Sequence, residues 1–107
     1  MVIKTWNIEA MTGYKPKTTF YEDFSIADAF GVLAVKDTFR RAMRGWKDNY
    51  EYLTELAMAM NWKVNEHYCN GNMRFADLYQ ELYEQVDTYC QEHLTGEELS
   101  YYYRTTD

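Results

Sequence analysis

Two histidines and two cysteines are the residues of this chain best suited to hold a metal ion. They form His67-x-Cys69 and Cys90-x-x-His93, a set that suits Zn²⁺ in ligand type. The helical pattern described below separates the two pairs, because a helix beginning near residue 73 rises about 26 Å before it reaches the second pair. Ligands so far apart do not share an ion, and a Cys69–Cys90 disulfide would need Cα atoms within ~7 Å of each other. We therefore predict no metal and no cofactor, with His93 packed on an apolar helix face and both cysteines reduced.

Catalytic arrangements of other kinds do not emerge either. Di-iron helical bundles place a Glu three residues before a ligand histidine, but Val64 and Cys90 hold those positions here. The chain has no glycine-rich phosphate loop and no Gly-x-Ser-x-Gly elbow. Its helical carboxylates are expected in solvent, where nothing tunes one of them to act as a general acid. The sequence predicts a protein that is not an enzyme and has no small-molecule substrate.

Basic residues in segment 25–47 suit contact with a nucleic acid. Residues 25–32 are similar to the first helix and turn of a helix-turn-helix, although Asp37 stands where that motif has an apolar residue. The turn would then be longer, and Phe39 would take the apolar role. The alternative is that the basic side chains are simply solvated or pair with the acidic half of the chain. The candidates for contact with phosphates or base edges are Lys36, Arg40, Arg41, Arg44 and Lys47.

The charge of the chain is divided unevenly between its two parts. Residues 1–47 hold eight Lys and Arg against five Asp and Glu, and residues 48–107 hold three against twelve, which gives the net charge of −6. Regularly spaced carboxylates can imitate a phosphate backbone, so the acidic part suits a mimic of DNA that binds a nucleic-acid-binding protein. The carboxylates in question are Asp77, Glu81, Glu84, Asp87 and Glu92.

Met58 and Trp62 indicate a second apolar face on the helix that contains them. They lie opposite its main apolar stripe, on the side that also carries Glu51, Glu55 and Glu66. A helix with two apolar faces is usually covered on both. We expect either the N-terminal arm or another subunit to cover this second face, which makes Met58 and Trp62 candidates for partner binding.

Periodic apolar residues predict two long helices. The first spans 48–69 from a cap at Asp48 or Asn49, and the second spans 73–93 after an Asn70-Gly71 stop. A loop this short between helices of similar length implies an antiparallel hairpin. The stripe of the first helix holds Tyr50, Leu53, Leu56, Ala57, Met60, Val64 and Tyr68, and that of the second holds Phe75, Leu78, Tyr79, Leu82, Val86, Tyr89 and His93.

Shorter helices are expected on either side of this hairpin. Ser25, three residues before an Asp, has the pattern of an N-cap, and Gly31 would end the helix that it begins. A further helix would start at Asp37, and whether residues 32–36 are helix or loop stays open. Residues 95–98 have the pattern of a capping box that opens a last helix.

These elements predict an all-α fold, a small helical bundle around the antiparallel hairpin 48–69/73–93. A length of 107 residues suits a single domain, 1–107. Gly13 and Pro16 interrupt residues 1–17, which we expect to form an irregular or short extended N-terminal arm before the helical part, 18–107.

Apolar stretches in the chain are too short for a membrane. The N-terminus lacks the apolar core of a signal peptide, and the longest uncharged, mostly apolar run covers only residues 29–35, far short of the ~18 residues that a span requires. We therefore expect a cytoplasmic protein that does not bind membranes.

Four stretches resemble a small, uncharacterised protein family carried on plasmids, conjugative elements and prophages of Gram-positive gut bacteria. The resemblance covers most of residues 18–107 and implies a cytosolic accessory protein of a mobile element, without an activity or a site to transfer. The stretches are TTFYEDFSIAD (18–28), KDTFRRA (36–42), YLTEL (52–56) and GEELSYYYRTTD (96–107).

The sequence as a whole predicts a non-enzymatic helical interaction protein that acts through a protein partner or as a homo-oligomer. One alternative is a small DNA-binding regulator that uses the helix-turn-helix-like segment 25–47. A further alternative is an acidic mimic of DNA that inhibits a host nucleic-acid-binding protein.

Overall fold

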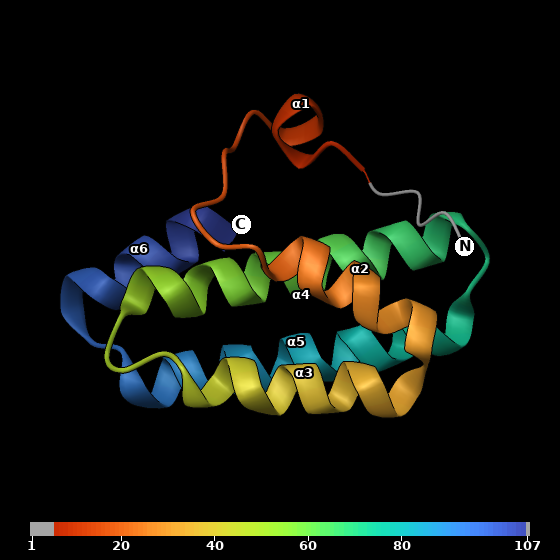
Figure 1. Cartoon of the computed structure of the whole chain (residues 1–107). Helices are drawn as coiled ribbons and strands as arrows, with labels where there is room; N and C mark the ends of the chain where they lie inside the picture. Colours follow the sequence, from red (N-terminus) through yellow and green to blue (C-terminus); the bar gives the residue numbers. More distant parts are fainter. Residues whose placement is uncertain (1–5, 107) are drawn as a thin grey trace.

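The computed structural model describes residues 6–106, which form six α-helices and contain no strand (Figure 1). The predicted all-α fold is confirmed. Residues 1–5 of the predicted arm and residue 107 lie outside the described part. The helices are α1 (Ile8–Thr12), α2 (Phe20–Phe30), α3 (Val32–Arg44), α4 (Tyr50–Cys69), α5 (Met73–His93) and α6 (Gly96–Thr106).

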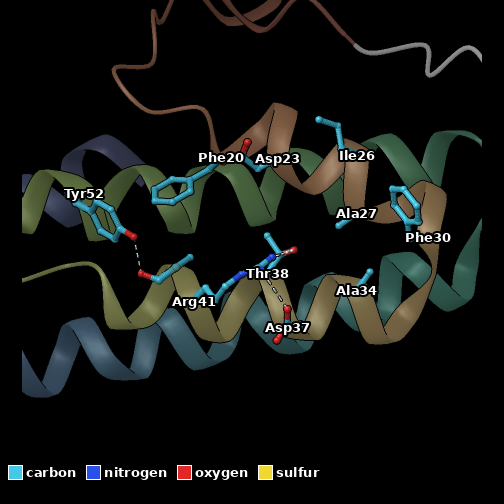
Figure 2. Close-up of a pocket in the computed structure, with 11 residues that line it drawn as sticks. Phe20, Asp23, Ile26, Ala27, Phe30, Ala34, Asp37, Thr38, Arg41 and Tyr52 are labelled. Carbon is cyan, nitrogen blue, oxygen red and sulfur yellow. Dashed lines mark hydrogen bonds and ion pairs between the residues drawn. The ribbon is translucent and has the colours of Figure 1, made fainter.

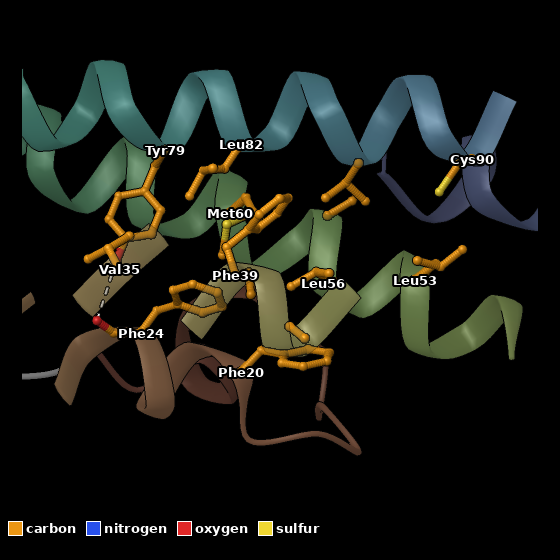
Figure 3. Close-up of a cluster of buried hydrophobic side chains, with 14 of the residues drawn as sticks. Phe20, Phe24, Val35, Phe39, Leu53, Leu56, Met60, Tyr79, Leu82 and Cys90 are labelled. Atoms are coloured by element: carbon orange, nitrogen blue, oxygen red, sulfur yellow. Dashed lines mark hydrogen bonds between the residues drawn. The ribbon is translucent and has the colours of Figure 1, made fainter. Parts of the chain in front are cut away.

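The predicted antiparallel hairpin is formed by α4 and α5. Asn49 caps α4 by accepting the backbone N–H of Tyr52 at 3.2 Å, and Gly71, at φ 76°, lets the chain reverse after α4. Apolar side chains of both helices fill the space between them (Figure 3). Each fully buried Leu, Val or Met contributes about 1.5–3 kcal/mol to folding, so this seam is the main source of stability. Its fully buried members include Leu53, Leu56, Met60, Tyr79 and Val86.

Helices α2 and α3 complete the core on one side of the hairpin (Figures 1 and 3). Phe24 and Val35 are fully buried there. The predicted N-cap at Ser25 is wrong, because α2 already begins at Phe20 and the Ser25 hydroxyl donates to the carbonyl of Tyr21 at 2.8 Å within the helix. The predicted start at Asp37 is also wrong. Residues 32–44 form one continuous helix, since Val35 and Phe39, one turn apart, are both buried.

The predicted apolar stripes are wrong at their ends. Tyr68 is 64% exposed. The predicted stripe runs from Met60 to Val64 and Tyr68 in steps of four, whereas the buried seam runs from Met60 to Lys63 and then to His67. His93 is exposed, because Cys90 and Leu94, one turn apart, take the buried positions at that end of α5. The His93 ring instead stacks on Tyr89, with ring centroids 3.8 Å apart.

The N-terminal arm covers the second face of α4. The arm contains the five-residue helix α1, which Asn7 caps by accepting from Ala10 at 3.1 Å, in place of the predicted strand or wholly irregular segment. Further along, the Tyr14 ring lies against Trp62, with centroids 6.4 Å apart. Of the two covers expected for this face, the structure therefore contains the arm.

Helix α6 packs on α4 and α5 near the arm (Figure 1). It begins at Gly96, as the sequence pattern predicts, and its fully buried Tyr102 donates a hydrogen bond to Asp87 at 2.7 Å. Across residues 6–106, the helices are each too short or too polar to span a membrane.

Candidate functional site

A cluster of charged side chains is buried where α2, α4 and α5 meet. We call Asp28, Lys63, Glu66 and His67 the ionic cluster. Lys63 lies one turn before the adjacent Glu66 and His67 on α4, and the three residues are only 1%, 5% and 6% exposed. The Lys63 ammonium lies 2.7 Å from Asp28 Oδ2 and also pairs with the Glu66 carboxylate. It donates a third hydrogen bond to the Ser25 hydroxyl at 3.0 Å, so all three of its protons are used.

Two tyrosines and the histidine complete the hydrogen bonds of the carboxylates. Tyr79 donates to Asp28 Oδ1 at 2.5 Å, and Tyr21 donates to Glu66 Oε1. His67 Nε2 lies 2.8 Å from Asp28 Oδ2. Because an ionised carboxylate only accepts hydrogen bonds, this nitrogen carries a proton. In the neutral ring the other nitrogen, Nδ1, is then an acceptor, and it faces the Asn72 amide nitrogen at 3.4 Å.

The pKa of Asp28 and the pKa values of the two tyrosines are shifted in opposite directions. Burial by itself would raise the pKa of Asp28, but the hydrogen bonds from His67, Lys63 and Tyr79 outweigh it and hold that pKa below its usual value. Burial, assisted by the neighbouring carboxylates, raises the pKa of both Tyr21 and Tyr79. The tyrosines therefore remain protonated donors while Asp28 remains ionised, which is the arrangement that a permanent structural network needs.

Three members of the ionic cluster have the chemistry of a metal site. Asp28, Glu66 and His67 each offer one ligand atom, and these atoms all lie within 4.8 Å of one another. The ammonium of Lys63, however, already lies among them and pairs with both carboxylates. A metal ion would have to displace a buried cation that the chain itself supplies. We assign the ionic cluster to the attachment of α2 to α4.

The two histidines and two cysteines that suit Zn²⁺ in ligand type are not brought together. His67 stacks on Phe75 and Tyr79 near the start of α5, with ring centroids 5.0 and 5.5 Å apart. His93 contacts Trp46 and lies eighteen residues beyond Phe75, about 27 Å further along the same helix. Cys69 and Cys90 are free, the first exposed and the second buried. Burial raises the pKa of the Cys90 thiol to about 12, which makes it unreactive.

A further buried carboxylate, outside the ionic cluster, fastens the arm. Glu55, 3% exposed on α4, accepts from the Tyr14 hydroxyl, from the backbone N–H of Lys17 and from both the N–H and the hydroxyl of Thr18, all at 2.7–3.0 Å. Burial would raise the pKa of Glu55, but these hydrogen bonds outweigh it and lower that pKa. The sequence pattern assigned Glu55 and Glu66 to the side of α4 that carries Met58. The structure shows that both are held by partners from outside the helix.

The basic residues expected to contact nucleic acid are all exposed. They lie on α3 and on the turn that follows it. The lengthened turn that the helix-turn-helix pattern required is absent, because Asp37 lies inside α3. Asp37 instead pairs with Arg40 at 3.5 Å and with Arg41 at 3.3 Å, and both arginine side chains remain about two-thirds exposed. The exposed set is Lys36, Arg40, Arg41, Arg44 and Lys47.

The residues expected to bind a partner occupy two different settings. Met58 and Trp62 are half-buried and line a recess of about 340 Å³ beneath the arm and the end of α6. Asp77, Glu81 and Glu84 lie exposed on α5. Asp87 is half-buried and accepts the Tyr102 hydroxyl, so it holds α6 and is not part of an open acidic row.

A groove between α2 and α3 is the surface feature that the sequence analysis did not predict. Its volume is about 540 Å³, and Figure 2 shows its lining residues between the two helices. Phe30 and Leu33, at the corner where α2 passes into α3, are 80% and 82% exposed, and Ile26 is 53% exposed. Ile26 and Phe30 are spaced by four residues, which was a detectable sign of a second apolar face on α2. The lining includes Phe20, Asp23, Ile26, Ala27, Phe30, Ala34, Asp37, Thr38, Arg41, Ala42 and Tyr52.

Comparison with protein-family models, with curated proteins and with solved structures finds no match for this chain. Any statement about its function therefore depends on the geometry described above.

Proposed function

We propose that this protein is a non-enzymatic interaction protein that binds a protein partner through the α2–α3 surface. The observation that carries the proposal is the exposure of three apolar side chains on one corner of the fold, which we call the corner patch: Ile26, Phe30 and Leu33. Phe30 and Leu33 are more than three-quarters exposed. Clustered large apolar side chains beside a groove are typical of interaction sites, whereas single ones are ordinary.

The surroundings of the corner patch support this proposal. The groove next to it has an apolar floor that includes Ala27 and Ala42, and charged side chains at its edge, Asp37 and Arg41 among them. An apolar centre with a polar rim is the usual composition of a protein interface. Covering a fully exposed Phe or Leu yields about 1.5–3 kcal/mol for each side chain, so two such residues are enough to dominate binding.

The buried ionizable groups support a role without catalysis. Members of the ionic cluster pair with one another, and every side-chain polar atom buried in the described part of the chain has a hydrogen-bond partner. A general acid or base needs contact with a substrate, whereas Lys63 and Glu66 are at most 5% exposed.

A capture experiment with matched variants tests the proposed function. The tagged chain, a Phe30→Ser/Leu33→Ser variant and a Tyr68→Ser/Met73→Ser control are incubated with lysate of the encoding organism, and bound proteins are quantified by mass spectrometry. The control removes two exposed apolar side chains that flank the turn between α4 and α5 and do not line the groove. We expect proteins that bind the original chain and the control but not the corner-patch variant. Equal capture by all three would contradict the proposal.

Contact with DNA through α3 is the second candidate function. It is favoured by the five exposed basic residues on α3 and the following turn. Binding of random duplex would weaken steeply with salt and would be lost in an Arg40→Ala/Arg41→Ala/Arg44→Ala variant. Absence of duplex binding at low salt would remove this candidate.

A further inference from the structure

Helices α2 and α3, which form the groove, carry exposed side chains of opposite charge, and of these Asp23 of α2 and Arg41 of α3 line the groove itself. The exposed ionic residues of α2 are the acids Glu22 and Asp23. Helix α3 exposes four basic residues, two of which also pair with its half-buried Asp37. The chain reverses direction at the single residue Gly31, so that the two helices run in opposite directions (Figure 1). The α2–α3 surface therefore has an acidic side and a basic side with the corner patch at one end. The exposed basic residues of α3 are Lys36, Arg40, Arg41 and Arg44.

A surface of this kind is complementary to itself. A two-fold axis that runs along the groove, parallel to the helices, places α2 of each copy against α3 of the other. Residues equally distant from Gly31 then meet at the same level. Glu22 and Asp23 precede Gly31 by nine and eight residues, and Arg40 and Arg41 follow it by nine and ten. The acids of one copy therefore lie at the level of the arginines of the other.

The same axis brings the apolar corners together. Phe30 directly precedes Gly31 and Leu33 follows it by two residues, so Phe30 of one copy lies at the level of Leu33 of the other. Both side chains are more than three-quarters exposed in the single chain. An axis perpendicular to the helices would instead place α2 against α2 and α3 against α3, so that helices of like charge meet. Charge thus selects one of the two possible symmetric arrangements.

We propose that the occupant of the α2–α3 surface is a second copy of this chain, in a symmetric dimer whose contact is a four-helix arrangement of α2 and α3 from each copy. This inference rests on the proposed function and names its partner. A stable interface of ordinary size buries about 800 Å² on each partner, which is about one-eighth of the 6676 Å² accessible surface of the chain. The corner patch supplies the apolar contact, and the pairing of acids with arginines sets the orientation.

Charge-reversal variants test this arrangement by sedimentation velocity of the full chain over a concentration series. One variant is Glu22→Lys/Asp23→Lys, and the other is Arg40→Glu/Arg41→Glu. Each variant alone opposes like charges across both α2–α3 contacts, so we expect its self-association to be weaker by roughly tenfold or more. An equimolar mixture pairs opposite charges again and should restore a mixed dimer. Circular dichroism melts verify that each variant is folded.

Reversals of the same size elsewhere on the surface serve as controls. Glu81→Lys/Glu84→Lys on α5 matches the acidic variant, and Arg74→Glu/Arg104→Glu matches the basic one. Both control variants should dimerise as the original chain does. Phe30→Ser/Leu33→Ser should be monomeric, because it removes the apolar contact without a change of charge.

Three results would overturn the dimer. They are a monomeric original chain at every concentration, a dimer that neither charge reversal weakens, and a mixture that fails to restore association. A monomeric chain that still captures another protein through Phe30 and Leu33 would remove the dimer and leave the proposed function in place. If the corner-patch variant still self-associates and still captures the same proteins, both the dimer and the proposed function are refuted.

Discussion

At the scale of single residues, the buried positive charge of Lys63 is stable only because of the groups around it. The residue is 1% exposed, and its ammonium pairs with Asp28 and Glu66. Removing a charge from water costs several kcal/mol, and close pairing with opposite charges offsets that cost. The two carboxylates need Lys63 for the same reason, so the three charges are stable only as a unit.

Lys63→Met is therefore expected to lower the free energy of unfolding by about 3–5 kcal/mol, because it leaves two buried carboxylates without their cation. Urea denaturation at neutral pH measures this loss. Lys17→Met is the control, since Lys17 forms an exposed pair with Glu51 at 3.1 Å and its loss should hardly move the midpoint. Adding Asp28→Asn and Glu66→Gln to Lys63→Met should recover part of the stability. An equal effect of the two lysine substitutions would refute the assigned role of the ionic cluster.

At the scale of elements, the connection between α2 and α3 depends on Gly31. Its backbone, at φ 112° and ψ −174°, lies in a region that is essentially restricted to glycine. Gly13 also has a positive φ, but its φ of 75° and ψ of 1° lie in the left-handed helical region that other residues can enter. A Cβ at either position would meet no atom within 4 Å. Any difference between the two sites is therefore a property of the backbone alone.

Gly31→Ala is expected to destabilise the protein by about 1–3 kcal/mol, more than Gly13→Ala does. Thermal denaturation of the two variants, side by side with the original chain, measures the difference. The larger loss should be accompanied by weaker burial of Phe24 and Val35, because the corner sets how α2 and α3 approach the core. Equal midpoints for the two variants would show that the Gly31 backbone relaxes at no cost.

At the scale of the whole molecule, two different forces hold its parts together. The α4–α5 hairpin is joined by apolar and aromatic side chains that do not change charge as the pH falls. The arm and α2 are attached to α4 through the carboxylates of Glu55 and Asp28, in addition to their apolar contacts. Both carboxyl groups have a pKa below the usual value. Their contribution is therefore complete above the unfolded-state values of about 4 and is lost as the pH falls through the lower folded-state values.

Acid should consequently loosen the arm and α2 before it loosens the hairpin. Hydrogen-exchange mass spectrometry, expressed as protection factors over a pH series, should show residues 14–30 losing protection at a higher pH than α4 and α5. Glu55→Gln should already show lower protection of the arm at pH 7, with the rest of the fold unchanged. Simultaneous loss of protection throughout the chain would contradict this division of forces.

Local regularity explains what was predictable about this protein. Apolar residues that recur about every 3.6 positions indicate a helix, and an Asn-Gly pair indicates its end. Both signals depend only on residues close together in the sequence. That information was sufficient for α4, α5, the short loop between them and the all-α class. It was insufficient at the ends of the stripes, where the choice between Val64 and Lys63 depends on what the neighbouring helix presents.

The candidate site belongs to contacts between distant segments and was missed for that reason. Lys63 and His67 extend the buried seam of α4 because Asp28, more than thirty residues earlier, meets them there. Phe30 and Leu33 have apolar side chains like those of the core, yet the reversal at Gly31 turns them outward. Periodicity tells which residues share a face of a helix. Whether that face meets an opposite charge, an apolar partner or water is decided by the packing of helices against one another, because the free energy of burial depends on the partner as much as on the residue itself.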